Sequence, residues 1–223
     1  MKENGVSERI RFYFDPLCPW CYQTSRWVRR LHELGEVEAD WAVFSLETVN
    51  ADNEESQVKG HARSERALRT VMAVREVAGA DGVSRFYGTL GEAVHQRGEA
   101  VEDPDVVRAA LAGAGLDPEL SDKAMADDGT WEAVEAEHSA LVERTRSFGV
   151  PTIVLDGGEG PAMFGPVISE VPDDEDAVKL FHHVAWLVRY ENFSELKRDR
   201  TLTPDLESIR QSNARRAARQ AQG

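Results

Sequence analysis

Cys18 and Cys21 are the only cysteines of this 223-residue chain, and they lie in Cys18-Pro19-Trp20-Cys21. The motif follows a strand-like run, residues 9–14, and is continued by a helix-like segment, residues 22–33. A helix N-terminus carries unpaired backbone N–H groups and the positive end of the helix dipole, and both favour a thiolate over a thiol. Because the thiolate attacks disulfides and electrophiles, the pattern predicts a thioredoxin-like redox centre. We expect Cys18 to be the nucleophile and Cys21 the resolving thiol.

Two other roles for the cysteine pair fit the sequence less well. A structural disulfide would close a ring of only four residues, and so short a ring constrains the unfolded chain little. A zinc site needs four ligands, and no further cysteine exists. Histidines could complete such a site, but none has the H-x3–5-H spacing of a zinc finger: His61, His95, His138, His182 and His183. We therefore expect redox chemistry and no metal.

Charge and hydropathy indicate which kinds of binding partner and which cellular location to expect. The chain has 40 acidic and 26 basic residues, a formal net charge of −14, which argues against nucleic acid or an anionic membrane as the main partner. The first twenty residues do not read as a secretory signal, and no stretch reaches the roughly 18 apolar residues that span a bilayer. We expect a cytoplasmic protein, monomer or homodimer. Cytoplasmic thiols are kept reduced, so this location favours a reductase over a disulfide-forming oxidase.

The spacing of apolar residues predicts an α/β chain with a large helical interruption. Strands are expected over 9–14, 37–46 and 150–158, the last followed by an Asp-Gly turn and a partner strand over 162–165. Between them, helical spacing predicts helices over 62–78, 83–96, 104–114 and 130–147, and one starting at Asp117-Pro118; Asp103 is the expected N-cap ahead of Pro104. A last helix is expected over 173–190. We therefore predict a discontinuous thioredoxin-like domain, residues 1–50 and 148–200, with an inserted helical lid domain, residues 51–147.

The C-terminal segment lacks this regular spacing. Periodicity is lost after Glu191, and four arginines make the end locally basic: Arg210, Arg215, Arg216 and Arg219. For the tail, residues 201–223, we expect a short helix or a disordered segment against the acidic surface rather than a binding arm.

A proline is expected opposite the redox pair. Val150-Pro151 lies between the longest helix and a strand, and a cis peptide there would turn the chain sharply and leave the preceding backbone free to bind an extended substrate. We expect the bond to be cis, although most bonds that precede proline are trans.

The run from Phe14 to Cys21, with Ser25-Arg26-Trp27, resembles the DsbA-like thioredoxin-fold family, and more narrowly its actinobacterial mycothiol-dependent nitroreductase branch. Weaker matches fall in the same order along the chain: Phe44-Ser45-Leu46 with Asn50, Val94-His95-Gln96, Val150-Pro151-Thr152, Phe164-Gly165-Pro166-Val167 and Glu195-Leu196-Lys197-Arg198. The resemblance covers about residues 10 to 200. It implies a thioredoxin fold interrupted by a helical lid, with NADPH-derived electrons delivered through mycothiol to oxidised thiols or small electrophiles, including nitro compounds.

The resemblance also implies roles for individual residues. Asn50 and His95 match polar residues of the family's cleft, and the His95 imidazole could stabilise the thiolate or donate a proton, or could simply be held at a helix C-terminus. Pro19 and Trp20 tune the turn, and Trp20 could present a flat surface to an aromatic substrate or pack on the inserted helices. Val150 stands where this branch more often has threonine. Asp15 could take part in proton transfer or cap the turn.

Three other functions stay open at this point. A general protein disulfide oxidoreductase or isomerase would use the same motif. Kappa-class glutathione transferases and related isomerases share the broad fold, but they usually carry serine near the position of Cys18 and lack the second cysteine. A chaperone-like binding module would not need either cysteine. Because thioredoxin-like folds host many activities, the fold does not decide between them.

Overall fold

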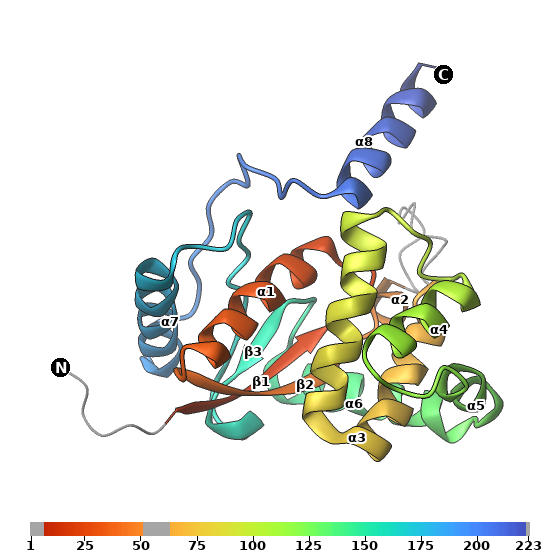
Figure 1. Ribbon diagram of the computed structural model, residues 1–223. Coiled ribbons are helices and arrows are strands. Elements are labelled where there is room, and N and C mark those ends of the chain that lie inside the picture. The colour runs from red at the N-terminus through yellow and green to blue at the C-terminus, as the bar shows by residue number, and fades with distance from the viewer. Residues whose placement is uncertain (1–6, 51–62, 222–223) are drawn as a thin grey trace.

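The computed structural model describes residues 7–50 and 63–221, which form a four-stranded sheet with helices on its faces (Figure 1). Strand order is β2-β1-β3-β4. β1 (Glu8–Phe14) runs parallel to β2 (Val37–Val43) and antiparallel to β3 (Thr152–Val154), which in turn pairs antiparallel with β4 (Ala162–Phe164). The predicted α/β class and the hairpin after residue 150 are thereby confirmed. The second strand was predicted too long, because Ser45 Oγ accepts from the backbone N–H of Thr48 and begins the short helix α2 (Leu46–Asn50).

Two helices pack together beside the sheet. α1 (Pro19–Glu33) buries Trp27, Val28 and Leu31, the face that the sequence predicts. α7 (Asp174–Arg189) packs against α1, where the Trp27 indole N–H donates to the carbonyl of Ala177 at 3.1 Å. In Figure 1, α1 runs across the middle of the molecule, and its C-terminal end lies beside α7. α1 is therefore held at its centre by α7, and its N-terminus is fixed against the end of β1.

The helices that follow α2 lie in the order that the sequence predicts. They are α3 (Glu65–Gly91), the π-helical turn η2 (Glu92–Gln96), α4 (Pro104–Gly113), α5 (Leu120–Ala126) and α6 (Gly129–Thr145). The helices expected over 62–78 and 83–96 meet at a break inside α3, where Gly79 adopts a φ of 62° that glycine tolerates and an α-helix does not contain. Asp103 is confirmed as the N-cap of α4, accepting from Asp105 N–H at 2.9 Å. Residue 62 lies outside the described residues.

These helices share one apolar core with the sheet. Ala67, Leu68 and Val71 of α3 are fully buried in the same cluster as Phe12 and Phe14 of β1. Polar groups of the helices also bond to the sheet: Arg75 of α3 donates to the carbonyl of Trp41, and Glu137 of α6 accepts from the Val43 N–H. The division into a thioredoxin-like domain and a lid domain stays a prediction.

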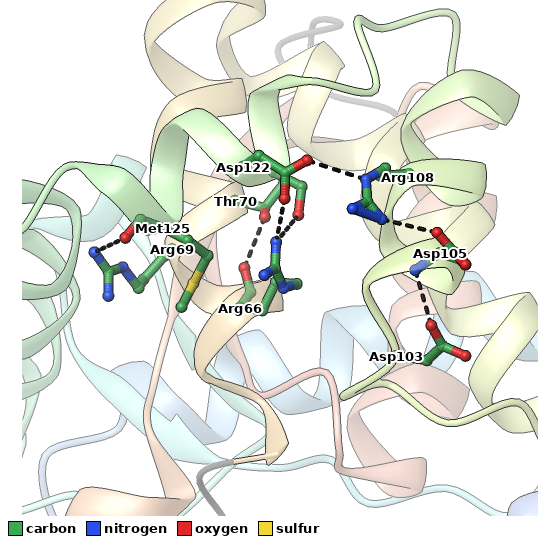
Figure 2. Close-up of polar contacts among 9 residues, drawn as sticks. Arg66, Arg69, Thr70, Asp103, Asp105, Arg108, Asp122 and Met125 are labelled. Atoms are coloured by element: carbon green, nitrogen blue, oxygen red, sulfur yellow. Dashed lines mark hydrogen bonds and ion pairs between the residues drawn. The ribbon is translucent and has the colours of Figure 1, made fainter.

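Polar contacts connect the helices at their outer side (Figure 2). The carboxylate of Asp122 on α5 accepts from Arg66 of α3 at 2.9 Å and from Arg108 of α4 at 3.0 Å. Arg108 also donates to Asp105 in the first turn of its own helix. Arg69 of α3 reaches the carbonyl of Met125 at 3.1 Å. One carboxylate thus joins three helices.

The C-terminal segment ends in a helix, one of the two forms expected for it from the sequence. Residues 191–206 are irregular, and α8 (Glu207–Gln220) follows. α8 contacts η2, Arg215 on α8 interacts electrostatically with Glu102, and the helix then projects away from the body (Figure 1). None of the helices in residues 7–50 and 63–221 combines the length and apolar character needed to cross a bilayer.

Candidate active site

The redox motif lies where β1 ends and α1 begins. The turn from Asp15 to Cys18 is closed by the Cys18 N–H, which donates to the carbonyl of Asp15 at 3.0 Å. Cys18 is the N-cap of α1, and its Sγ accepts from the backbone N–H of Cys21 at 3.4 Å. Pro19 occupies the first helical turn, where its missing N–H leaves no helical hydrogen bond unmade. The strand–turn–helix arrangement that the sequence predicts around the cysteines is confirmed.

The two sulfurs have opposite electrostatic environments. The pKa of Cys18 is lowered, chiefly because the Cys21 thiol donates to it and also because backbone N–H groups of the first turn do so. The pKa of Cys21 is raised well above its ordinary value, chiefly by burial. Cys18 is 8% exposed and Cys21 is fully buried. The outer sulfur is therefore the better thiolate, and the inner one holds its proton.

Val150-Pro151 faces the outer sulfur, and its peptide bond is cis, as predicted. The carbonyl oxygen of Val150 lies 3.8 Å from Cys18 Sγ, and the thiol donates to it. The bond between Gly165 and Pro166 is also cis, which the sequence analysis missed. The carbonyl of Pro166 accepts from the Thr24 hydroxyl of α1 at 2.9 Å and so ties the β4 end of the hairpin to the redox helix.

Asp15 is a buried carboxyl group at the base of the turn. It accepts from the backbone N–H groups of Leu17 at 2.8 Å and Leu46 at 2.9 Å, and from the Ser64 hydroxyl at 3.4 Å. Burial nevertheless raises its pKa from 3.8 to about 6. Asp15 thus caps the turn and joins it to the start of α2. It also places a group that titrates near neutral pH behind the sulfurs, where its charge raises the pKa of both cysteines.

His95 lies on η2, fully buried, with both ring nitrogens engaged. Nε2 lies 2.9 Å from the carbonyl oxygen of Pro16, and Nδ1 lies 3.0 Å from the Ser208 hydroxyl. A carbonyl only accepts, so the proton is on Nε2 and Nδ1 accepts from Ser208. Burial lowers the pKa of His95 to about 4, so the ring is neutral at physiological pH. Within the described part of the chain, its hydrogen bonds go to the redox turn and to α8 rather than to a sulfur.

Tyr22 and Gln96 support the same imidazole. The Tyr22 ring stacks on His95 with centroids 5.2 Å apart, and Gln96 donates to the Tyr22 hydroxyl at 2.6 Å. Of the remaining predicted site residues, Trp20 is half-buried beside the motif, with the guanidinium carbon of Arg200 5.1 Å above its ring. Asn50 is the last residue of α2, and its side chain lies outside the described residues.

Sequence reasoning missed Tyr22, Ser208 and Arg200. Tyr22 follows Cys21 directly, and its position on the buried face of α1 could have indicated it. Ser208 and Arg200 carried no signal, because each meets the site through a contact between residues more than a hundred positions apart. Among the side chains of the described residues, no cluster of three or more His, Cys, Asp and Glu could bind a metal ion; His61 lies outside them.

The sequence was compared with protein families and with known proteins. The family model described as Rv2466c-like, mycothiol-dependent nitroreductase Rv2466c, matches residues 17–198. The uncharacterized protein Rv2286c of Mycobacterium tuberculosis is 31% identical over 204 residues, 91% of this chain and 86% of that protein.

Two solved structures share the fold at low sequence identity. The cytosolic disulfide reductase DsbM of Pseudomonas aeruginosa has a TM-score of 0.56 and 15% identity, over 80% of this chain and 99% of that one. The probable DsbA oxidoreductase SCO1869 of Streptomyces coelicolor has a TM-score of 0.51 and 18% identity, over 86% and 94%. The fold is therefore the DsbA-like thioredoxin fold with a large helical insertion. The chain belongs to the Rv2466c-like family of mycothiol-dependent nitroreductases.

Proposed function

We propose that the protein is a thiol–disulfide oxidoreductase that takes electrons from mycothiol and reduces small electrophiles, such as nitro compounds, or mixed disulfides. The observation that carries the proposal is the pair of sulfurs at the N-terminus of α1. Cys18 is the more acidic and more accessible thiol, and Cys21 is buried directly behind it. A nucleophile with a protonated resolving thiol next to it is the arrangement that thiol exchange requires.

The catalytic cycle that we propose has two half-reactions, and electrons and protons balance in each. In the first, the reduced pair gives two electrons and two protons to the substrate and becomes the Cys18–Cys21 disulfide. In the second, a mycothiol thiolate attacks Cys18 Sγ, the Cys21 thiolate leaves and takes a proton, and a second mycothiol releases Cys18 as oxidised mycothiol forms. Since the chain contains no third cysteine, the reductant must be an external thiol. NADPH enters only upstream, by regenerating mycothiol.

Other residues of the site position these groups in our scheme. Val150 and Pro151 bring a backbone carbonyl to Cys18 and form the wall against which an incoming disulfide or electrophile lies. Pro19 and Trp20 shape the turn, and Asn50 is proposed to line the substrate side. His95 acts as a positioning residue, because its hydrogen bond goes to Pro16 rather than to the sulfurs. A cytoplasmic location is proposed as well, in keeping with DsbM, a cytosolic disulfide reductase of the same fold.

A second candidate is disulfide exchange on protein substrates. Phe148 is 71% exposed two residues before Val150, and its ring lies 4.8 Å from that of Phe164. An exposed aromatic ring packed on a half-buried one, close in sequence to the cis-proline, is suited to binding an unfolded chain. The intact Cys-Pro-Trp-Cys motif argues against the kappa-class transferase and isomerase functions. A chaperone-like module would keep its binding after both cysteines are replaced.

A single-turnover experiment tests the leading proposal. Reduced protein is mixed with an equimolar nitroaromatic compound, and the mass of the intact protein is measured by mass spectrometry. We expect the mass to fall by that of two hydrogen atoms as the disulfide closes. Mycothiol should then restore the reduced mass faster than glutathione at equal concentration. Cys18→Ser protein, the matched control, should show neither change. A nitro compound consumed at the same rate by the Cys18→Ser variant would contradict the proposal.

A further inference from the structure

Arg200 places a guanidinium group directly over the redox motif. Its central carbon lies 5.1 Å from the centroid of Trp20, which stands between Pro19 and Cys21. A guanidinium stacked on an indole uses its planar face, so the N–H groups along its edge stay available. The stack also fixes the orientation of those donors. Arg200 thus presents an oriented fork of donors at Trp20, within the redox motif.

The charge of Arg200 is not neutralised by the protein. Ten of the other twenty arginines of this acidic chain make ion pairs with carboxylates: Arg11, Arg30, Arg63, Arg66, Arg69, Arg75, Arg97, Arg108, Arg189 and Arg210. Within residues 7–50 and 63–221, Arg200 forms none, and its contact is the Trp20 ring. An exposed cation without a carboxylate partner, in a protein with a net charge of −14, is free to bind an anion from outside.

The segment that carries Arg200 is anchored next to the redox turn. Pro204 and Leu206 are buried although the residues around Arg200 are exposed. Two residues after Leu206, the Ser208 hydroxyl bonds to His95, whose other nitrogen bonds to Pro16 in the turn. The segment connects α7 to α8 (Figure 1), is held at the α8 side by these contacts, and brings Arg200 onto Trp20 of the motif. The matched family model ends at residue 198, just before Arg200.

We propose that Arg200 is a specificity-determining residue that binds an anionic group, above all a carboxylate, on the small aromatic electrophile or disulfide that Cys18 attacks. Arginine binds carboxylates through two parallel, charge-assisted hydrogen bonds, which fix direction as well as position. A carboxylate held over Trp20 would place the rest of a planar molecule toward Cys18. The inference rests on the proposed role of Cys18 as nucleophile and adds the class of substrate.

The test compares two aromatic disulfides that differ in charge. Dithiobis-nitrobenzoate carries two carboxylates, and dithiodipyridine is neutral at pH 7. In a Cys21→Ser background the Cys18 thiolate attacks one sulfur of the reagent, a mixed disulfide forms, and a coloured thiolate or thione leaves. In the Arg200→Ala variant we expect the rate with the anionic reagent to fall roughly tenfold, as the loss of a charge-assisted pair implies. The rate with the neutral reagent should stay within about twofold, and Arg200→Lys should fall between.

Arg219→Ala is the matched control, because it removes the same charge from the exposed far end of α8. The inference is overturned if this control slows the anionic reagent as much as Arg200→Ala does, since attraction by net charge would then explain the effect. It is also overturned if Arg200→Ala slows both reagents equally, because Arg200 would then act only on the shape of the turn. If neither reagent modifies Cys18 even with Arg200 present, the proposed nucleophile itself is wrong.

Discussion

Nε2 of His95 lies 2.9 Å from the carbonyl oxygen of Pro16, two residues before Cys18. The same ring accepts from Ser208 at the start of α8, so a neutral imidazole joins the C-terminal helix to the redox turn. The sequence left open whether His95 acts on the sulfurs or is held structurally. The contacts favour a positioning role, in which the ring fixes the turn that places Cys18.

Replacing His95 should therefore lower the stability of the fold more than it lowers the rate of thiol exchange. In His95→Ala the Pro16 carbonyl and the Ser208 hydroxyl lose their partner, and a cavity replaces a buried ring. We expect a loss of about 2–4 kcal/mol in the free energy of unfolding, measured by urea denaturation. His95→Gln, which keeps a donor and an acceptor, should recover part of it. An unchanged midpoint with a large fall in thiol-exchange rate would support direct catalysis instead.

Acid should weaken the fold through the same residue. Burial lowers the folded pKa of His95 from 6.5 to about 4, so the unfolded chain binds a proton that the folded chain does not. The stabilisation is present above pH 6.5 and is lost as the pH falls toward 4, amounting to about 3 kcal/mol at most. The difference in unfolding free energy between wild type and His95→Gln should shrink over this range. A constant difference from pH 7 to pH 4 would contradict the assignment.

Asp15 should impose a different pH dependence on the nucleophile. Because its pKa is raised to about 6, its charge develops between pH 5 and 7 and raises the pKa of Cys18. Asp15→Asn should lower the apparent pKa of Cys18, read from the pH profile of iodoacetamide alkylation in the Cys21→Ser background. Asp40→Asn, at a surface ion pair with Arg11, is the control and should leave the profile unchanged. A profile that Asp15→Asn does not move would show that Asp15 only caps the turn.

Asp15 also affects stability with the sign opposite to that of His95. Its folded pKa lies above its ordinary value of 3.8, so the folded chain retains a proton that the unfolded chain has released. Its contribution to stability is therefore full below about pH 4 and is lost as the pH rises through 6. The free energy of unfolding of the wild type should fall between pH 4 and pH 6 relative to that of Asp15→Asn, and this comparison separates the effect of Asp15 from that of His95.

Phe148 distinguishes small from macromolecular substrates. Phe148→Ser removes an exposed ring and should change the unfolding free energy by less than about 0.5 kcal/mol. If unfolded proteins are substrates, the variant should reduce their disulfides several-fold more slowly, with no change for small disulfides. Val77→Ser on α3 is the control for loss of an exposed apolar side chain. Equal rates for wild type and Phe148→Ser on a protein disulfide would rule against this surface.

The local features of the site followed from the sequence, and the contacts between distant segments did not. Cys18 at a helix N-terminus, the Asp103 cap and the hairpin after Val150 each depend on a few neighbouring residues with strong conformational preferences. The break between the helices expected over 62–78 and 83–96 falls at Gly79, whose positive φ interrupts α3. The bond from His95 to Ser208 spans 113 positions, and nothing in the local sequence of α8 indicates it.

The stack of Arg200 on Trp20 was unpredictable for the same reason. An irregular segment brings the two residues together. Irregular segments have no hydrophobic periodicity from which their path could be predicted. The family resemblance also stopped short, because residues beyond about 200 lie outside it. The sequence therefore predicted the reacting cysteines. The structure identifies the distant residues that lie around them.

The most direct test of the account uses Cys21→Ser protein exposed to equal concentrations of oxidised mycothiol and oxidised glutathione, followed by intact mass spectrometry. Without the resolving thiol, attack by Cys18 should stop at the mixed disulfide. We predict a mycothiol adduct on Cys18, in clear excess over the glutathione adduct, and none on the Cys18→Ser, Cys21→Ser double variant. Protein that carries neither adduct, or carries only glutathione, would contradict the mycothiol-dependent mechanism.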